Sequence, residues 1–428
     1  MKSHIWHPFT QMKTSQAPLK VTSGKGIWLN LEDGRTVMDL ISSWWVNIHG
    51  HSHPEIAKAI YEQATTLEHV IFAGFTHEPA EQLSQRLIPL MPSSLNRVFF
   101  SDNGSTAVEV ALKMAYQYWL NKGETDRTTF IAFDNSYHGD TLGAMSAGSR
   151  SIFSKPFEGL MFDVNYVPYP STYIGDDDAE QKERNSLDAI TALLEANPSS
   201  HAALIIEPLI QGAGGMNMCR PQFLQKLAQL LKRYDTLLIY DEVMTGFGRT
   251  GDWFASIKSN TLPDLMCMSK GLTGGFLPLS VTACSEEIYE AFYSDDPMKT
   301  LYHGHSYTAN PLGCAAALAS LTLLERNPAM FKEMEDQHNL FAESIKTNNI
   351  VQRIRVCGTI LALDIVTSQE DGYLNDVASI IKQQAVQKGM LLRPLGNTLY
   401  IMPPYCITRD ELHKAYAGIT DLLAGLTL

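Results

Sequence analysis

The chain lacks the features that mark nucleic-acid-binding, exported or membrane proteins. Its 428 residues include 33 Lys and Arg against 46 Asp and Glu, so the net charge is -13, and the basic residues do not form a continuous run. Binding to a phosphate backbone is therefore disfavoured. No window approaches eighteen uninterrupted apolar residues, and the N-terminus has no apolar segment typical of a signal peptide. We expect neither a membrane span nor export.

Cysteine is scarce as well, and its placement excludes a disulfide framework. The six cysteines stand alone, without a Cys-x-x-Cys pair, and most have apolar neighbours: Cys219, Cys267, Cys284, Cys314, Cys357 and Cys406. This pattern is typical of reduced thiols in a core. We therefore expect a reducing, cytoplasmic location.

Long apolar stretches that end in carboxylates organise the first three quarters of the chain. Residues 201–208 and 235–243 are near-continuous apolar runs, and a helix is predicted between them at 221–234, with Pro221 at its start. Such runs are typical of parallel strands buried on both faces. Further strands are predicted at 97–100, 129–133 and 264–268. The sequence therefore predicts an α/β fold with a large, doubly wound, mostly parallel sheet.

The composition changes near Asn327, where charged helical sequence begins. We predict three parts: an N-terminal flap at 1–50 that belongs to a small domain, a large domain at 51–326, and a small α+β domain at 327–428. The flap should contain a hairpin around Asp33-Gly34. The last part should contain a strand at 360–366, a helix at 377–388, a hairpin at 390–403 that turns at Gly396-Asn397, and a final helix capped by Thr408.

Lys270 stands where the predicted strand at 264–268 ends and a glycine-rich segment begins. The open end of an α/β sheet is where ligands bind, so this lysine should be partly desolvated. Desolvation lowers the pKa of an ammonium group and frees the amine to attack an aldehyde as a Schiff base. Gly271, Gly274 and Gly275 would leave room for a bulky adduct.

Three other strand ends carry suitable partners for such an adduct. Gly104, Ser105 and Thr106 lie between the strand at 97–100 and a predicted helix at 107–120, where free N–H groups and the helix dipole favour a phosphate. Tyr137 follows the strand at 129–133 and could stack on a ring. Asp241 ends the strand at 235–243. A lysine, a carboxylate for a pyridinium nitrogen, an aromatic residue and a phosphate cradle are the parts that pyridoxal phosphate needs.

Two other motifs admit alternatives that we reject. His49, His51 and His53 are spaced two apart, but no Cys or carboxylate joins them nearby, so zinc is disfavoured and no metal is predicted. The segment 246–251 matches Gly-x-Gly-x-x-Gly, but it follows its strand too late and leads into loop sequence instead of a helix. A dinucleotide site is therefore not predicted.

Over essentially its whole length the chain resembles the class III aminotransferases of fold type I, and within them the biotin-biosynthesis branch that aminates 7-keto-8-aminopelargonate. The resemblance is carried by Trp6-His7-Pro8-Phe9-Thr10, Ser43-Trp44-Trp45, Tyr137-His138-Gly139-Asp140-Thr141, the stretch from Asp241 to Gly251, Ser269-Lys270-Gly271 and Arg393-Pro394-Leu395-Gly396. The wider class has Glu in the phosphate loop where this chain has Thr106.

The resemblance implies a cofactor, pyridoxal 5'-phosphate, and a role for each matched residue. Lys270, Asp241 and Tyr137 would be catalytic. Lys270 would form the Schiff base and move the proton, while Asp241 would keep the ring nitrogen protonated. The cofactor-binding residues would be Gly104, Ser105, Tyr137, His138, Glu207, Asp241, Val243, Lys270 and, from the second subunit of a homodimer with shared active sites, Ser306. The substrate pocket would comprise Phe9, Trp44, Trp45, Tyr137, Arg249, Gly304, Arg393 and Tyr400, with Arg393 holding the keto acid's carboxylate.

The identity of the amino donor and two alternative functions stay open at this point. Trp44 and Trp45 offer a flat surface that would suit the adenine and sulfonium of S-adenosylmethionine, which we predict as donor. Phe9 stands where many relatives have Tyr, which favours lysine instead. Another class III activity, an ω-amino acid transaminase or an aminomutase, shares the cofactor residues. A non-catalytic regulator with this fold is disfavoured because Lys270 and Asp241 are both present.

Overall fold

A seven-stranded sheet forms the centre of the computed structural model, which describes residues 4–426. Its strand order is β4-β12-β11-β10-β7-β5-β6, and only β12 runs antiparallel to its neighbours. The strands are β4 (Arg97–Ser101), β5 (Thr129–Phe133), β6 (Val164–Val167), β7 (His201–Ile206), β10 (Leu237–Asp241), β11 (Leu265–Met268) and β12 (Ser280–Cys284). The predicted α/β fold with a mostly parallel sheet is confirmed.

Helices cover both faces of this sheet, and the side chains of β10 show why. Leu237 and Ile239 pack in one buried cluster with α4, whereas Leu238 and Tyr240 pack in another with α7. Successive side chains of a strand point to opposite faces, so a strand covered on both sides must be apolar throughout. The surrounding helices are α2 (Pro54–Ala64), α3 (Glu78–Leu87), α4 (Gly104–Lys122), α5 (Leu142–Ala147), α6 (Ala179–Ala196), α7 (Pro221–Arg233), α8 (Ala255–Lys258), α9 (Glu286–Phe292) and α10 (Pro311–Arg326).

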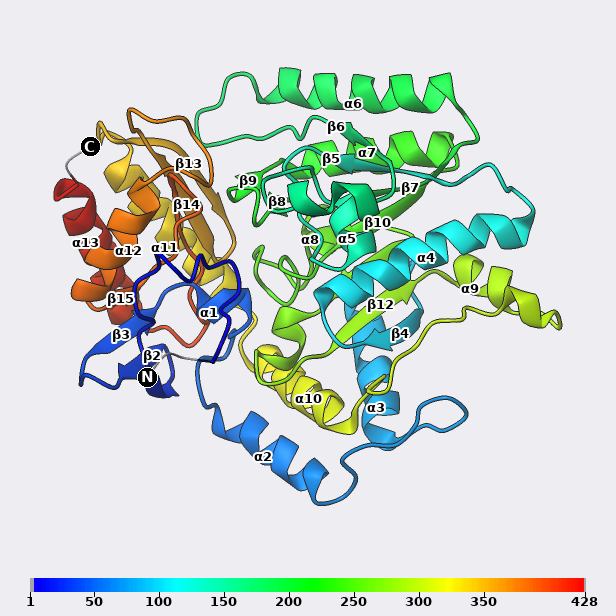
Figure 1. Cartoon of the computed structure of the whole chain (residues 1–428), viewed down its shortest axis with the longest axis horizontal. Coiled ribbons are helices and arrows are strands. Elements are labelled where there is room, and N and C mark those ends of the chain that lie inside the picture. Colours follow the sequence, from blue (N-terminus) through cyan, green and yellow to red (C-terminus); the bar gives the residue numbers. More distant parts are fainter. Residues whose placement is uncertain (1–3, 427–428) are drawn as a thin grey trace.

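The N-terminal strands form a second sheet with a strand from the end of the chain. In this sheet β1 (Val21–Lys25), β2 (Trp28–Leu31) and β3 (Thr36–Asp39) are followed by β15 (Met390–Leu391), which pairs with β3 in parallel. The predicted hairpin around Gly34 joins β2 to β3. Figure 1 accordingly shows the N-terminal strands beside the C-terminal helices, to the left of the main sheet. This pairing supports the proposal that the flap at 1–50 belongs with the C-terminal part.

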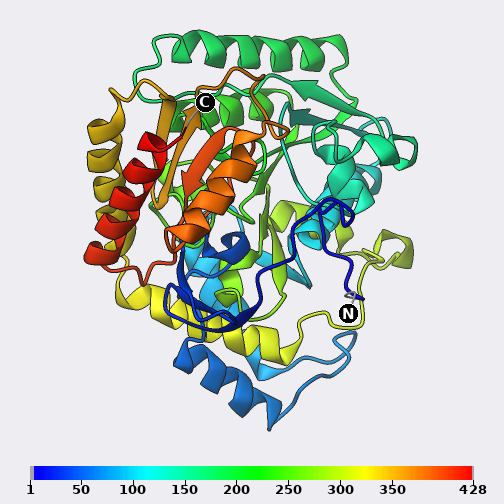
Figure 2. The same ribbon diagram turned by 60° about the vertical axis from the view of Figure 1, so that its left-hand side comes forward.

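The C-terminal part combines a three-stranded sheet with three helices. Its strands are β13 (Val351–Cys357), β14 (Ile360–Ile365) and β16 (Thr398–Ile401), and its helices are α11 (Met330–Ile345), α12 (Val377–Gln387) and α13 (Arg409–Ala424). Figure 2 shows α12 and α13 next to each other at the surface. As predicted, Thr408 caps α13 through a capping box with Glu411.

Three local predictions were wrong. The segment 390–403 is not a hairpin, because β15 joins β3 while β16 joins β14; only the turn at Gly396-Asn397 closes, through the pair Leu395 and Thr398. The helix predicted from 107 begins at Gly104, because Asn103 caps it. Cys406 is exposed, whereas the other five cysteines are buried and all six are free.

Two of the three glycines in segment 246–251, Gly248 and Gly251, allow close packing against the C-terminal part. A Cβ at Gly248 would lie 2.4 Å from Phe331, and one at Gly251 would lie 3.2 Å from the Cα of Gly358. Both glycines also have positive φ, 96° and 95°. The segment forms turns after β10 and does not begin a helix directly after the strand.

None of the helices within residues 4–426 is long and apolar enough to cross a membrane.

Candidate active site

A cavity of about 1230 Å³ lies at the carboxyl ends of β5, β7, β10 and β11. Parallel strands present these ends at one edge of the sheet, where ligands of α/β proteins bind. Residues of the C-terminal part line its other side. Its lining includes most of the residues predicted from the sequence: Phe9, Trp44, Trp45, Gly104, Ser105, Tyr137, His138, Glu207, Asp241, Val243, Lys270, Arg393 and Tyr400.

Lys270 lies two residues after the end of β11 in a strained backbone conformation. Its φ is +40°, a region that side-chain-bearing residues rarely adopt, and such strain is concentrated at functional sites. Burial lowers the pKa of its ammonium group, against the opposing effect of Asp241 and Glu207. Its Nζ lies 5.2 Å from the ring centre of Trp45. The lysine is thus held as an amine that loses its proton more easily than an exposed lysine.

Two of the three glycines after Lys270 lie away from the cavity, so the predicted room for an adduct is limited to Gly275. A Cβ at Gly271 would lie 3.1 Å from Phe247, and one at Gly274 would lie 2.8 Å from His49. Neither glycine lines the cavity, whereas Gly275 does. These residues allow the turn after β11 to pack closely against its neighbours.

Asp241 is the last residue of β10, and its carboxylate is buried and doubly hydrogen-bonded. Oδ2 lies 2.7 Å from Nδ1 of His138, and Oδ1 accepts the backbone N–H of Val243 at 3.1 Å. The other ring nitrogen of His138 is buried without a partner within the described residues. These two contacts fix the direction of the Asp241 carboxylate at the cavity wall.

Glu207 follows β7 and ties two loops together beneath the cavity. Its carboxylate accepts the backbone N–H groups of Tyr137, at 3.0 Å, and of Gly212, at 2.9 Å. Burial raises its pKa to about 7, although these two N–H donors and His138 act in the opposite direction. Glu207 therefore fixes the loop that carries Tyr137.

The N-terminus of α4 faces the same cavity. Gly104 and Ser105 occupy its first turn, where backbone N–H groups have no acceptor inside the helix. A Cβ at Gly104 would lie 2.6 Å from Cγ1 of Val243, and one at Gly139 would lie 2.0 Å from Oγ of Ser105. The loops that carry Gly139 and Val243 thus approach this helix end so closely that only glycine fits at positions 104 and 139. A phosphate is the ligand that such a cradle favours.

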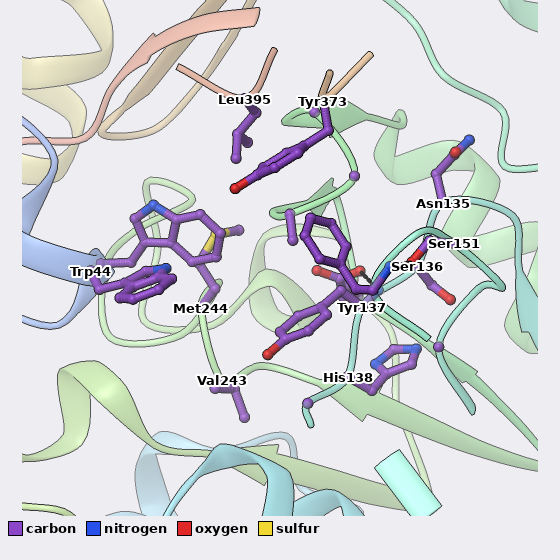
Figure 3. Close-up of a pocket in the computed structure, with 18 of the residues that line it drawn as sticks. Trp44, Asn135, Ser136, Tyr137, His138, Ser151, Val243, Met244, Tyr373 and Leu395 are labelled. Carbon is purple, nitrogen blue, oxygen red and sulfur yellow. Dashed lines mark hydrogen bonds between the residues drawn. The ribbon is translucent and has the colours of Figure 1, made fainter. Parts of the chain in front are cut away.

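Aromatic side chains form the walls of the cavity. Figure 3 shows Trp44 on one side, Tyr373 and Leu395 projecting from the C-terminal loops, and Tyr137 above Val243 and His138. The guanidinium carbon of Arg393 lies 4.5 Å from the ring centre of Trp44. Burial and the nearby Asp140 raise the pKa of Tyr137, so its phenol keeps its proton at neutral pH. A flat ring and a carboxylate would both find partners here.

The two tryptophans, from which the sequence predicted one flat surface, have different surroundings. Trp45 is only 5% exposed, and its Nε1 donates a hydrogen bond of 2.9 Å to the hydroxyl of Tyr400. Trp44 is more exposed, but Arg393 covers one face of its ring and Phe9 lies 5.6 Å away, edge to face. A broad open surface made of both indoles is therefore not formed.

Three predicted residues do not line the cavity. Arg249 is 1% exposed and lies behind Trp45: it donates to the carbonyl oxygen of Pro403 at 3.0 Å and to that of Trp45 at 3.5 Å. It therefore supports the wall instead of facing a substrate. Gly304 and Ser306 are exposed on a segment outside the cavity.

Sequence reasoning missed Asp39, which holds the backbone turn that carries both tryptophans. This turn is α1 (Ser42–Trp45), and φ is positive at Ser42, Ser43 and Trp45. The buried carboxylate of Asp39 accepts the N–H groups of Ile41 and Ser43, the hydroxyl of Ser43, and Nε2 of His51 at 3.0 Å. The signal in the sequence was a carboxylate at a strand end just before Ser-Ser-Trp-Trp.

Two of the three histidines near residue 50 have separate hydrogen-bond partners, and the ring centre of the third, His53, lies 6.1 Å from that of His49. His51 contacts Asp39, and Nε2 of His49 lies 2.9 Å from the hydroxyl of Ser320. Burial lowers the pKa of His49 to about 3. No group of three His, Cys, Asp or Glu residues within 4–426 is arranged to hold a metal ion.

Comparison with known proteins identifies relatives over the whole chain. The sequence model of the family described as "Aminotransferase class-III" matches residues 9–423. The adenosylmethionine-8-amino-7-oxononanoate aminotransferase of Synechococcus elongatus is 57% identical over 98% of both chains, and that of Geobacter sulfurreducens is 40% identical over 100% of this chain and 97% of the relative.

Solved structures give the same result. The enzyme of that name from Methanocaldococcus jannaschii superposes with a TM-score of 0.91 at 34% identity, covering 99% of this chain and 98% of the other. A PLP-bound amine transaminase from an uncultivated Pseudomonas species superposes with a TM-score of 0.93 at 30% identity, covering 99% of each chain.

Proposed function

The chain belongs to the class III aminotransferases, and we propose that it transfers an amino group from S-adenosylmethionine to 8-amino-7-oxononanoate, which is 7-keto-8-aminopelargonate, giving 7,8-diaminopelargonate for biotin synthesis. The observation that carries this proposal is the full-length match, at 57% identity, to an enzyme named for this reaction. The cavity supports it, because Arg393 offers a carboxylate partner beside an aromatic wall.

The enzyme depends on pyridoxal phosphate, and the residues present fit this cofactor. The helix end at Gly104 and Ser105 provides a phosphate cradle in which glycine is required, and Lys270 and Asp241 line the same cavity. When bound, the cofactor supplies an aldehyde that condenses with amines and a ring that accepts electrons. Lys270 would hold the aldehyde carbon, Asp241 the protonated ring nitrogen, and Val243 and Tyr137 the two ring faces.

Lys270 is suited to move a proton as well as to bind. Its pKa is lowered by burial, so the amine at Nζ can accept a proton from a substrate carbon and return it to another. Asp241 is held by His138 and the N–H of Val243, so its carboxylate is fixed in direction and would be available to the ring nitrogen of a bound cofactor. The phenol of Tyr137 keeps its proton and can donate a hydrogen bond.

The proposal is tested with purified protein loaded with pyridoxal phosphate. The keto acid is supplied with S-adenosylmethionine, lysine or another amino acid, and diaminopelargonate is measured by mass spectrometry. We expect product with S-adenosylmethionine. If product forms with lysine and not with S-adenosylmethionine, lysine is the donor and the assignment of the acceptor stands. Phe9, which lacks a hydroxyl at the cavity wall, favours this alternative.

An amine or ω-transaminase is the second candidate, because enzymes of that kind superpose well on this chain. The same assay separates it: turnover of simple amines with pyruvate, without turnover of the keto acid, would favour it. A regulator without catalysis would give no product with any pair.

We also propose a homodimer in which Ser306 reaches the partner's phosphate cradle. Large apolar side chains are exposed on two segments that meet where the ring of His69 lies 5.2 Å from Tyr307; they include Ile71, Phe75, Tyr293, Met298, Tyr302 and Tyr307. Such a patch favours a protein partner. Mixing Ser306→Ala with Lys270→Ala subunits should restore activity, because each hybrid has one intact site. If ultracentrifugation shows a monomer and that monomer is fully active, the proposal is contradicted.

We propose a cytoplasmic location as well, with which the free cysteines are compatible.

A further inference from the structure

Two aromatic residues at the cavity wall have no role in the chemistry described above. Phe153 comes from the segment between α5 and β6, and Tyr373 comes from the segment between β14 and α12. Their ring centres are 4.7 Å apart and their planes meet at 81°. Both line the cavity, and Figure 3 shows Tyr373 projecting into it. Two segments about 220 residues apart in the numbering thus build one corner of the site.

The surface around this corner is apolar and open. Ile152 and Leu374, the neighbours of the two aromatic residues, also line the cavity and are 50% and 74% exposed, and Tyr373 itself is 40% exposed. Exposed apolar side chains that gather at a cavity mark a binding surface. Two perpendicular rings leave a corner in which a flat ring can stack on one wall and meet the other at its edge.

The sequence pointed to a different place for the donor's flat ring, and the structure disfavours it. Trp45 is largely buried and hydrogen-bonded to Tyr400, and Arg393 covers one face of Trp44. Arg393 is also the cation suited to the keto acid's carboxylate. The packed pair of Trp44 and Arg393 is thus suited to a substrate carboxylate, and a donor that carries an adenine ring would extend beyond it.

The charge near Tyr373 suits a cationic donor. Glu370 and Asp371 come from the same segment and line the cavity. Asp371 is paired with Arg353, whereas the carboxylate of Glu370 has no ion-pair partner among residues 4–426. A free carboxylate beside an aromatic corner is compatible with the positive charge of a sulfonium.

We infer that Phe153 and Tyr373 form the subsite for the adenine ring of the amino donor, while Trp44 and Arg393 bind the keto acid. This inference rests on the proposed function, because it takes S-adenosylmethionine as donor. Stacking of a base on an aromatic side chain is worth about 1–3 kcal/mol, a factor of about five to a hundred in affinity.

The direct test measures binding of 5'-methylthioadenosine, which carries the adenine, ribose and thioether but no amino group to transfer. Titration calorimetry on the cofactor-loaded protein should show affinity lowered about five- to hundredfold by Tyr373→Ala and by Phe153→Ala. Tyr373→Phe keeps the ring and should retain affinity. Phe157→Ala is the matched control: Phe157 is an exposed aromatic residue of the same segment as Phe153 and does not line the cavity.

Steady-state kinetics gives an independent readout. Tyr373→Ala should raise KM for S-adenosylmethionine and leave KM for the keto acid unchanged, with the cofactor's absorbance and the thermal midpoint retained. Equal affinity of wild type and both alanine variants for 5'-methylthioadenosine would overturn the subsite, and so would a rise in KM for the keto acid alone. If wild type accepts only lysine, the donor in the proposed function is wrong; wild-type turnover with S-adenosylmethionine and unaffected variants would refute this inference alone.

Discussion

Replacing Glu207 by Gln should remove a pH-dependent loss of stability. Burial raises the pKa of this carboxyl from 4.5 to about 7. Between these two values the folded protein binds a proton that the unfolded chain has released, so stability falls as the pH rises. A shift of this size corresponds to about 3 kcal/mol in full, since each pKa unit is worth about 1.4 kcal/mol.

Part of this loss falls inside an accessible pH range. For a pKa that moves from 4.5 to about 7, about 2 kcal/mol is lost between pH 5.5 and pH 8, and little changes above pH 8. The amide of Glu207→Gln does not titrate, although it can still accept one of the two N–H groups that Glu207 holds. The variant should therefore gain stability relative to wild type as the pH rises.

The assay is urea unfolding of the cofactor-free protein at fixed protein concentration, at half-unit steps from pH 5.5 to 8. The free energy of unfolding of wild type is compared with that of Glu207→Gln at each pH. Glu333→Gln, on the exposed side of α11, is the control for replacing any carboxylate. A constant difference between wild type and Glu207→Gln across this range would refute the reasoning. It would mean that the N–H donors of Tyr137 and Gly212 keep Glu207 ionised despite its burial.

Three further predictions concern the site and its support. Lys270→Ala should abolish labelling of the site peptide by borohydride and pyridoxal phosphate and lower turnover by orders of magnitude; labelling elsewhere would show the wrong lysine was chosen. Gly104→Ala should weaken cofactor binding, measured by equilibrium dialysis, because its Cβ would lie 2.6 Å from Val243, whereas Gly159→Ala has open space and should not. Asp39→Asn should destabilise the protein by about 1–3 kcal/mol in urea unfolding, since it removes an acceptor from buried donors; an unchanged midpoint would count against its supporting role.

The sequence predicted the sheet and the strand-end residues because the relevant signals are local. A strand buried on both faces must be apolar throughout, so β7 and β10 could be recognised from their own residues. Lys270 and Asp241 then followed from the points where apolar runs stop. The parallel sheet brings these ends to one edge, so a cavity there could be expected before its shape was known. Their catalytic roles stay predictions.

Predictions that depended on distant contacts were the ones that were wrong. The short strand at 390–391 pairs with β3, about 350 residues earlier, and nothing in its own sequence distinguishes this from a local hairpin. Arg249 was expected at the substrate. Its acceptors are the backbone carbonyl oxygens of Trp45 and Pro403. Every residue has such a carbonyl, so the residue type at a position does not reveal that its carbonyl accepts a hydrogen bond.

The turn at α1 shows why the orientation of Trp44 and Trp45 could not be derived from their spacing. Residues with positive φ such as Ser42, Ser43 and Trp45 each cost on the order of 1–3 kcal/mol unless the surroundings hold them. Here Asp39 binds two N–H groups of the turn, and the hydroxyl of Ser42 donates to a carbonyl oxygen of the C-terminal part. The support comes from both ends of the chain. The cavity wall therefore forms only when those ends have folded together, and substitutions outside the cavity can alter substrate binding through this turn.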